Sequence, residues 1–205
     1  MSTTLDPAYA ALAAAIPDSE HYLADLTANL TPARLEHSLE VMAVMDRLAG
    51  IYALDRTRAL TAGLLHDAAK DFPAAALLEM AERAGLPLLD SCDRHPLYLH
   101  GPVGALYVRE KLGVDDAQIF DAIYTHSLVE NQSDFHAPFS WCLRFADILA
   151  PSRSWKDFHA QLGAVVYAGD LRGGALMALD WVVELFARLN NPVHPHLLHL
   201  KQHIV

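Results

Sequence analysis

The clearest pattern in the chain is a run of apolar residues at helical spacing between residues 31 and 50. Its repeating members, three or four residues apart, are Leu35, Leu39, Met42, Met45 and Leu48. Side chains at this spacing share one face of a helix that packs against a core. Thr31 followed by Pro32 is a favourable start, because the first position of a helix needs no amide hydrogen. The sequence therefore predicts a helix over residues 32–50.

Proline and glycine interrupt similar patterns along the rest of the chain. Pro17, Gly85 and Gly113 separate neighbouring apolar stretches, and Pro73 and Pro138 stand at the start of others. No segment alternates apolar and polar residues as a half-buried strand does. The segment 86–99 is expected to be an irregular connection. We therefore predict an all-α protein, a single helical bundle, with helices over residues 7–16, 18–30, 32–50, 55–71, 73–84, 100–112, 115–127, 138–149, 155–167 and 170–190.

The composition restricts the classes of protein that this bundle can represent. The chain has 205 residues, 53% of them hydrophobic, so it can bury one sizeable core. No apolar run approaches the roughly 18 residues of a membrane span, and we expect neither a signal peptide nor a membrane anchor. Two cysteines are too few for a disulfide framework, which favours a cytoplasmic location. A net charge of −10 argues against binding along nucleic-acid backbones.

An unusual pair of polar residues ends the apolar segment 58–65. His66 and Asp67 directly follow two leucines, and a buried carboxylate without a partner costs several kcal/mol. A divalent cation is the simplest partner, and Asp67 could bridge two such ions. A capped or salt-bridged helix end is the alternative. Lys70 lies one turn further on, where its ammonium can meet an anionic substrate.

Other ligand-type residues lie on the apolar sides or at the ends of separate predicted helices. They are His37, His100, His126 and Asp147. Each one alone leaves a structural role open, because inward histidines are often hydrogen-bonded core residues and Asp147 has Arg144 and Arg153 nearby as partners. The polar stretch 128–137 suits either a mobile loop beside a site or a plain surface loop. Taken together with His66 and Asp67, these residues indicate a metal site.

Five short blocks of the chain resemble the HD-domain metal-dependent phosphohydrolases, and most closely the bacterial symmetrical diadenosine-tetraphosphate hydrolases. The blocks are Arg34-Leu-Glu-His37-Ser, Ala62-Gly-Leu-Leu-His66-Asp67-Ala-Ala-Lys70, Leu99-His100-Gly-Pro, Asp121-Ala-Ile-Tyr-Thr-His126-Ser and Phe145-Ala-Asp147-Ile-Leu-Ala-Pro-Ser-Arg153. The resemblance covers about residues 31–155 and implies a single HD-domain helical bundle. We therefore divide the chain into an N-terminal helical extension (1–30), the HD core (31–155) and C-terminal helices that pack on the core (156–205).

The resemblance also implies two divalent metal ions. One ion would be held by His37, His66, Asp67 and Asp147, and the other by His100, His126 and a bridging Asp67. The family implies iron, although mixed imidazole and carboxylate ligands also suit manganese or another first-row metal. A metal-bridged hydroxide would cleave diadenosine tetraphosphate symmetrically into two ADP.

Residues next to these ligands are expected to act on the phosphates. By the same resemblance, Asp67 and Lys70 are predicted to be catalytic, and Lys70, Arg153, Arg34 and Ser127 to contact the substrate. One feature departs from the family pattern, which usually has His-Thr followed by a short turn with glycine. Here a histidine and Ser127 precede a polar stretch without glycine. This departure concerns the border of the expected pocket and leaves the metal ligands in place.

The sequence leaves two other classes of function open. One is another nucleotide phosphomonoesterase or cyclic-dinucleotide phosphodiesterase of the same fold. The other is a non-catalytic HD module that senses a metal or a nucleotide, although a degenerate site would be expected to have lost a ligand. The expected partner is a small dinucleoside polyphosphate, without nucleic acid or membrane, and a homodimer is left open.

Overall fold

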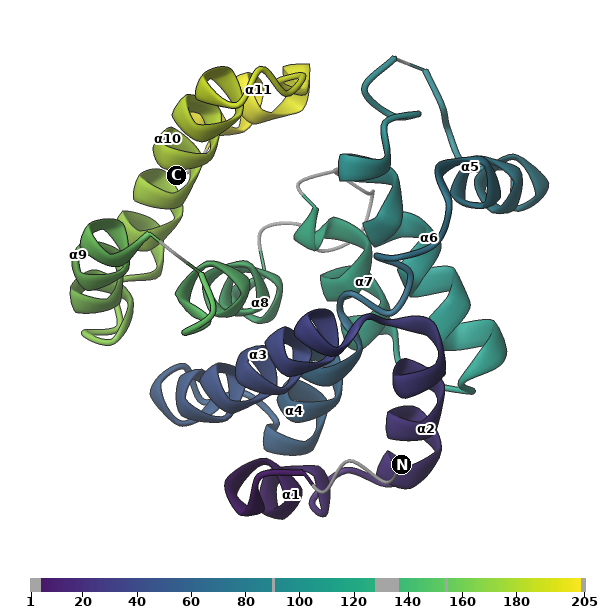
Figure 1. The fold of residues 1–205 in the computed structure, drawn as a ribbon. Coiled ribbons are helices and arrows are strands. Elements are labelled where there is room, and N and C mark those ends of the chain that lie inside the picture. The colour runs from purple at the N-terminus through teal and green to yellow at the C-terminus, as the bar shows by residue number, and fades with distance from the viewer. Residues whose placement is uncertain (1–4, 90, 128–136, 154, 204–205) are drawn as a thin grey trace.

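The computed structural model describes residues 5–89, 91–127, 137–153 and 155–203. Within these ranges the chain forms eleven α-helices and no β-strand (Figure 1), which confirms the predicted all-α class. None of these helices has the length and apolar character needed to cross a membrane. The helices are α1 (Pro7–Ala13), α2 (Ser19–Asn29), α3 (Pro32–Ile51), α4 (Arg56–Leu65), α5 (Ala74–Arg83), α6 (Pro96–Lys111), α7 (Ala117–His126), α8 (Pro138–Leu149), α9 (Lys156–Val166), α10 (Leu171–Arg188) and α11 (Pro195–His203).

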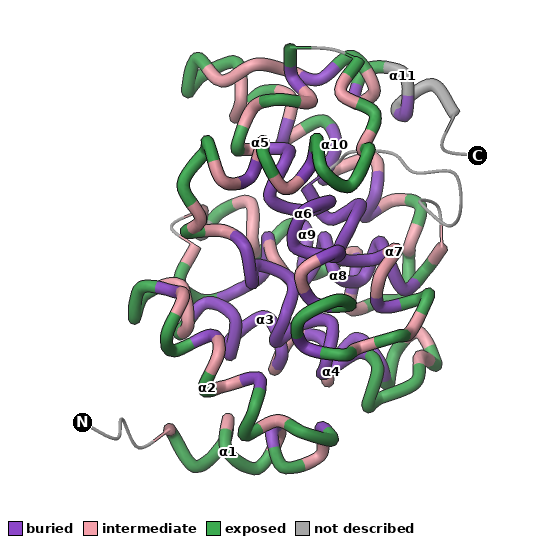
Figure 2. The backbone as a smooth tube through the Cα atoms, turned by 90° about the vertical axis from the view of Figure 1, so that its right-hand side faces the viewer, coloured by how far each residue is buried: buried purple, intermediate pink, exposed green. Residues whose placement is uncertain are grey.

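The helices form a bundle with α3, α4 and α8 in its middle. Figure 1 shows α5, α6 and α7 on one side of these three helices and α9, α10 and α11 on the other. Figure 2 shows the buried residues concentrated in the middle of the molecule, whereas most residues of α1 and α5 are exposed or half-buried. Burial of this core is the main favourable contribution to folding. Its largest fully buried side chains include Met42, Met45, Leu60, Leu64, Leu65, Tyr98, Phe139 and Phe145.

Gly63 allows α4 to lie directly against the backbone of α3. A Cβ atom at this position would lie 2.8 Å from the Cα of Met42 and 3.1 Å from the carbonyl oxygen of Val41. Both are backbone atoms, which no side-chain rotation can move aside. The missing side chain of Gly63 therefore sets the separation of α3, which carries His37, from the segment that carries His66.

The helix that precedes the His-Asp pair ends earlier than predicted. Asp55 caps its start as expected, with a side-chain oxygen accepting the Arg58 amide at 2.8 Å. Its predicted end at residue 71 is wrong, because α4 stops at Leu65 and the chain continues in tight turns. In these turns the amides of Ala68, Lys70 and Phe72 bond to carbonyls three residues earlier, with 2.9 Å between Lys70 and Asp67. Residues 64–72 contain neither glycine nor proline, so nothing in this segment marks the change in the sequence.

The helix that carries His100 begins earlier than predicted. It starts at Pro96, with the His95 ring accepting the Leu97 amide, so His100 lies inside α6 and not at its mouth. Pro102 within this helix has no amide hydrogen for the carbonyl of Tyr98, its usual acceptor four residues earlier. The hydroxyl of Ser127 donates to that carbonyl instead, at 2.7 Å. This bond ties α6 to the end of α7.

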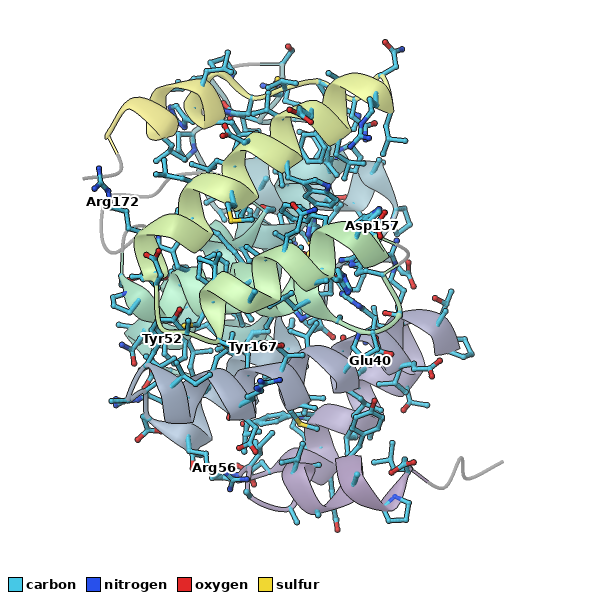
Figure 3. All side chains as sticks on the ribbon, turned by 90° about the vertical axis from the view of Figure 1, so that its left-hand side faces the viewer. Glu40, Tyr52, Arg56, Asp157, Tyr167 and Arg172 are labelled. Atoms are coloured by element: carbon cyan, nitrogen blue, oxygen red, sulfur yellow. The ribbon has the colours of Figure 1, made fainter. Side chains whose placement is uncertain are left out.

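The helices α9 and α10 lie side by side across one face of the bundle (Figure 3). The hydroxyl of Tyr52, just after α3, donates to the carbonyl of Val166 at 2.8 Å. The guanidinium carbon of Arg47 lies 3.5 Å from the ring centre of Tyr167, and Figure 3 shows this tyrosine near Tyr52. These contacts hold α9 against α3.

The division of the chain at residues 30 and 155 stays a prediction.

A buried tyrosine joins the C-terminal segment to α6. The hydroxyl of Tyr98 donates to the carbonyl of Pro192 at 2.6 Å and accepts the amide of His194 at 2.9 Å. The ring of His194 in turn bonds to Asp93, with 2.9 Å between Nε2 and Oδ1. The segment 192–194 is therefore fixed to the start of the helix that carries His100.

Candidate metal centre

Five of the six predicted metal ligands meet in two groups at the centre of the bundle. One group contains His37, His66 and Asp67, and the other contains Asp67, His100 and His126. The ligand atoms of each group lie within 4.8 Å of one another, and all five residues are buried. They come from α3, the turns after α4, α6 and the end of α7. Residues far apart in the sequence thus converge, with Asp67 shared by both groups.

Main-chain carbonyls orient three of the histidine rings. Each ring places Nδ1 near a carbonyl oxygen one turn earlier in the chain, and a carbonyl only accepts, so Nδ1 carries the proton and Nε2 keeps a free electron pair. Metal-binding histidines are typically oriented in this way. The pairs, with their Nδ1-to-oxygen distances, are His66 with Gly63 (2.9 Å), His100 with Pro96 (3.1 Å) and His126 with Ile123 (2.6 Å).

Several acceptor atoms in the centre face one another. Nε2 of His66 and Oδ2 of Asp67 are buried and have no hydrogen-bond partner among the described residues. The Nε2 atoms of His100 and His126 are only 3.0 Å apart, although both carry electron pairs. A buried polar atom without a partner costs about 1–3 kcal/mol, and a cation that accepts these electron pairs removes the cost. The residues therefore fit a divalent metal ion.

The charges of these residues match those of metal ligands. Burial lowers the pKa of His66 to about 3, and burial together with the Lys70 ammonium lowers the pKa of His100 to about 4. Burial would raise the pKa of Asp67, but the Lys70 ammonium holds it well below its usual range. Neutral imidazoles and an ionised carboxylate are the forms that bind a metal.

Asp147, the sixth predicted ligand, lies beside the first group. Its Oδ1 is 2.9 Å from Nε2 of His37 and also accepts a hydrogen bond from Arg153. Of the two cations considered as its partner, Arg153 is therefore the one that pairs with it, whereas Nε of Arg144 donates to the carbonyl of Thr125. Burial would raise the pKa of Asp147, but the Arg153 guanidinium holds it well below its usual range.

Two residues that the sequence did not single out support His37. Oγ of Ser152 lies 3.1 Å from Nδ1 of the His37 ring, and the amide of Ser152 donates to Oε2 of Glu40 at 2.9 Å. Glu40 lies on α3, one turn from His37 (Figure 3). Neither residue belongs to a spacing pattern, so the only signal in the sequence is the position of Ser152 next to Arg153.

Three cations predicted to contact phosphates line one pocket. They are Arg34, Lys70 and Arg153. Nζ of Lys70 donates to Nε2 of His100 at 2.8 Å and lies 3.5 Å from Oδ1 of Asp67. Arg34 pairs with Asp71, with 3.2 Å between Nε and Oδ1, and its side chain is partly exposed. The pocket therefore begins at the metal centre and carries positive charge there.

The opposite wall of this pocket is apolar and belongs to α10. The pocket has a volume of about 280 Å³, and α6, α7, α8 and α10 all contribute to it. From the sequence we expected the C-terminal helices only to pack on the core, because an apolar helix face looks the same whether it meets a core or a pocket. The residues of α10 that line the pocket are Ala178, Leu179, Trp181, Val182, Leu185 and Phe186.

Ser127, predicted to contact the substrate, lines the pocket but also has a structural bond. Its hydroxyl donates to the carbonyl of Tyr98, and a Cβ atom on Gly101 would lie 2.3 Å from its Oγ. Its role toward the substrate stays a prediction. Residues 128–136, nearly all of the polar stretch considered as a loop beside the site, lie outside the described residues.

Replacing Ser127 with alanine is expected to lower the free energy of unfolding by about 1–3 kcal/mol, because the carbonyl of Tyr98 would lose its donor. Chemical denaturation followed by circular dichroism measures this change. Ser38→Ala is the matched control, since Oγ of Ser38 is buried without a hydrogen-bond partner among the described residues. Equal stability of the two variants would show that the Ser127 bond contributes nothing.

The helical bundle and its two buried groups of histidine and aspartate define the class of HD-domain hydrolases. The family described as HD domain matches residues 34–153, more than half of the chain. The chain therefore belongs to the HD-domain family, as the five sequence blocks predicted.

Individual proteins similar to this chain agree with that class. A symmetrical bis(5'-nucleosyl)-tetraphosphatase of Halalkalibacterium halodurans is 27% identical over 170 residues, covering 83% of this chain and 88% of the relative. A protein of the same name from Bacillus subtilis is 34% identical over 108 residues, covering 53% of this chain and 58% of the relative. The crystal structure of a protein from Clostridium acetobutylicum, described as a predicted HD superfamily hydrolase involved in NAD metabolism, superposes with a TM-score of 0.82. It is 27% identical, and the match covers 92% of this chain and 97% of that one.

Proposed function

We propose that this HD-domain hydrolase cleaves diadenosine tetraphosphate symmetrically into two ADP. The observation that carries the proposal is the placement of two cations in one pocket. Lys70 contacts Asp67, which both ligand groups share, and Arg153 contacts Asp147. A tetraphosphate carries enough negative charge to bind both of these side chains and the proposed metal ions at the same time. The similarity to two relatives with this named activity supports the choice of substrate.

Two divalent ions would supply Lewis acidity, which lowers the pKa of a water molecule and offsets phosphate charge. We propose iron, with manganese or another first-row metal as the alternatives, because imidazole and carboxylate ligands suit all of them. His37, His66, Asp67 and Asp147 would hold one ion, and Asp67, His100 and His126 the other.

The reaction needs one water molecule for each substrate. Its oxygen adds to one of the two central phosphorus atoms, and the bond from that phosphorus to the central bridging oxygen breaks. One ADP carries the new oxygen and the other leaves as a diphosphate, which needs little protonation. Lys70 and Arg153 stabilise the charge that develops on the phosphates, and Arg34 and Ser127 contact the substrate further from the reacting bond.

Metal content and reaction products of the same preparation test the proposal. Protein purified without a histidine tag is expected to contain about two metal ions per chain, measured by mass spectrometry of the elements. Incubated with diadenosine tetraphosphate, it is expected to give ADP as the only nucleotide product in chromatography, two for each substrate consumed.

Other products would assign a different function. AMP together with ATP would exclude symmetric cleavage. Release of phosphate from a nucleoside monophosphate, or cleavage of a cyclic dinucleotide, would place the chain among the other HD-type nucleotide hydrolases. Metal and nucleotide binding without any product would indicate a sensing module. The cytoplasmic location and a homodimer stay predictions.

A further inference from the structure

The described residues leave the apolar wall on α10 partly uncovered. Trp181, Leu185 and Phe186 are only partly buried although they line the pocket, and Leu189, just beyond the helix, is 60% exposed. Large apolar side chains that face a pocket keep contact with water, which is unfavourable unless a ligand covers them. The charged residues across the same pocket indicate which kind of ligand this is, because it must be anionic at one end and apolar at the other.

A series of aromatic contacts leads from the charged end of the pocket to α10. The guanidinium carbon of Arg153 lies 5.2 Å from the ring centre of Trp155. The rings of Trp155 and Trp181 have centroids 4.4 Å apart, and Phe158 stacks on Trp181 at 4.6 Å with 6° between the ring planes. Arg153, which pairs with Asp147 at the metal centre, is thus followed by Trp155, just before α9, and by Trp181 on α10.

Nucleotides have the same order of chemical groups, with phosphates at one end and a flat base at the other. Bases stack on aromatic side chains with little dependence on their identity, and such stacking makes a substantial contribution to binding. Phe158 already supports Trp181, so the indole plane has little freedom to turn away from a base. The order of charged and aromatic groups along the pocket therefore matches one nucleoside with its phosphates.

We propose that Trp155 and the pocket face of α10 form a nucleobase site, with Trp181 as its principal stacking residue. The proposal rests on the proposed function for the phosphate end of the ligand. A volume of about 280 Å³ is slightly below the usual range of ligand pockets, roughly 300 to 1,000 Å³. The site therefore holds one nucleoside of a dinucleoside polyphosphate. Because α10 lies outside residues 34–153, the matched HD segment would bind the phosphates and the C-terminal helices would hold the base.

Binding measurements test this division separately from catalysis. The affinities of the metal-loaded protein for ADP and for methylenediphosphonate, which is a base-free diphosphate analogue that resists hydrolysis, are compared by calorimetry. Trp181→Leu keeps an apolar side chain but removes the ring, and is expected to weaken ADP binding roughly tenfold without changing the affinity for methylenediphosphonate. Trp181→Phe keeps a ring and is expected to retain most of the affinity for ADP.

A matched control excludes a general effect of removing an aromatic residue. Phe120 is a partly buried aromatic residue on α7 that packs on Tyr124 and does not line the pocket. Phe120→Leu is therefore expected to bind both ligands as the unsubstituted protein does. Unchanged ADP affinity in Trp181→Leu, or equal losses for ADP and methylenediphosphonate, would overturn the nucleobase site.

The two proposals fail in different experiments. The unsubstituted protein could produce no ADP from diadenosine tetraphosphate while Trp181→Leu loses affinity for ADP and keeps its affinity for methylenediphosphonate. In that case the proposed reaction is wrong and the nucleobase site stands. If the protein produces ADP alone and Trp181→Leu has the same KM as the unsubstituted protein, the reaction stands and the nucleobase site is wrong.

Discussion

Asp67→Asn is expected to lower kcat/KM for diadenosine tetraphosphate by at least about a hundredfold and to remove most of the bound metal. Asp67 is the one residue common to both ligand groups, and Nε2 atoms of His100 and His126 each lie 3.3 Å from its Oδ1. The amide keeps the shape of the side chain but carries no charge, so it cannot bridge two cations. Changing a residue that only supports a metal ligand already lowers activity about 10- to 100-fold, and changing a ligand shared by two ions would lower it further.

The measurement pairs metal content with steady-state kinetics, and circular dichroism checks that the variant is folded. Asp46→Asn is the matched control, because Asp46 forms a surface ion pair with Arg56 away from the centre, and such pairs contribute little to stability. It should keep its metal and its activity. Unchanged metal content and hydrolysis in Asp67→Asn would show that the buried carboxylate is not part of the site.

Gly63→Val is expected to destabilise the protein by roughly 3 kcal/mol, at the upper end of the usual cost of overpacking a core. The new Cβ would lie 2.8 Å from the Cα and 3.0 Å from the amide nitrogen of Met42. Because both are backbone atoms, α3 and α4 would have to separate. The same movement would shift His66 relative to His37, so metal content should fall together with stability.

Gly50→Val on α3 is the control for the intrinsic effect of replacing a helical glycine by valine. Nothing lies within 4 Å of a Cβ atom at Gly50, and this residue is exposed. The free energy of unfolding of the two variants, measured by chemical denaturation, should therefore differ by most of the overpacking cost. Similar values for both would mean that the two helices separate easily at Gly63.

The metal centre was largely predictable because polar residues stand out on apolar helices. His37, His66, Asp67, His100 and His126 each interrupt or end an apolar stretch, and the structure brings all five together. Burying such groups is unfavourable without a partner, so a polar residue within an apolar stretch indicates that a partner is present in the folded protein. Their binding of metal stays a prediction until ions are measured.

The parts that the sequence did not predict depend on contacts between distant segments. The end of α4 at Leu65 has no local stop signal, since the turn residues that follow include good helix formers. The start of α6 at Pro96 did have a local signal, but the proline at position 102 favoured a later start. The helix tolerates this proline because Ser127, which is remote in sequence, donates to the carbonyl that the proline leaves without a donor. The pocket face of α10 has the same amphipathic pattern as a packing helix.

The hydrogen bonds of Tyr98 have a consequence for the order in which a growing polypeptide can complete this fold. The HD segment ends at residue 153, but the partners of the Tyr98 hydroxyl are Pro192 and His194. While a ribosome is still adding those residues, that hydroxyl has neither of them, and burying it unpaired is unfavourable. The start of α6 therefore settles only after residues 192–194 have left the exit tunnel, and His100 reaches its final position after the whole HD segment has been synthesised.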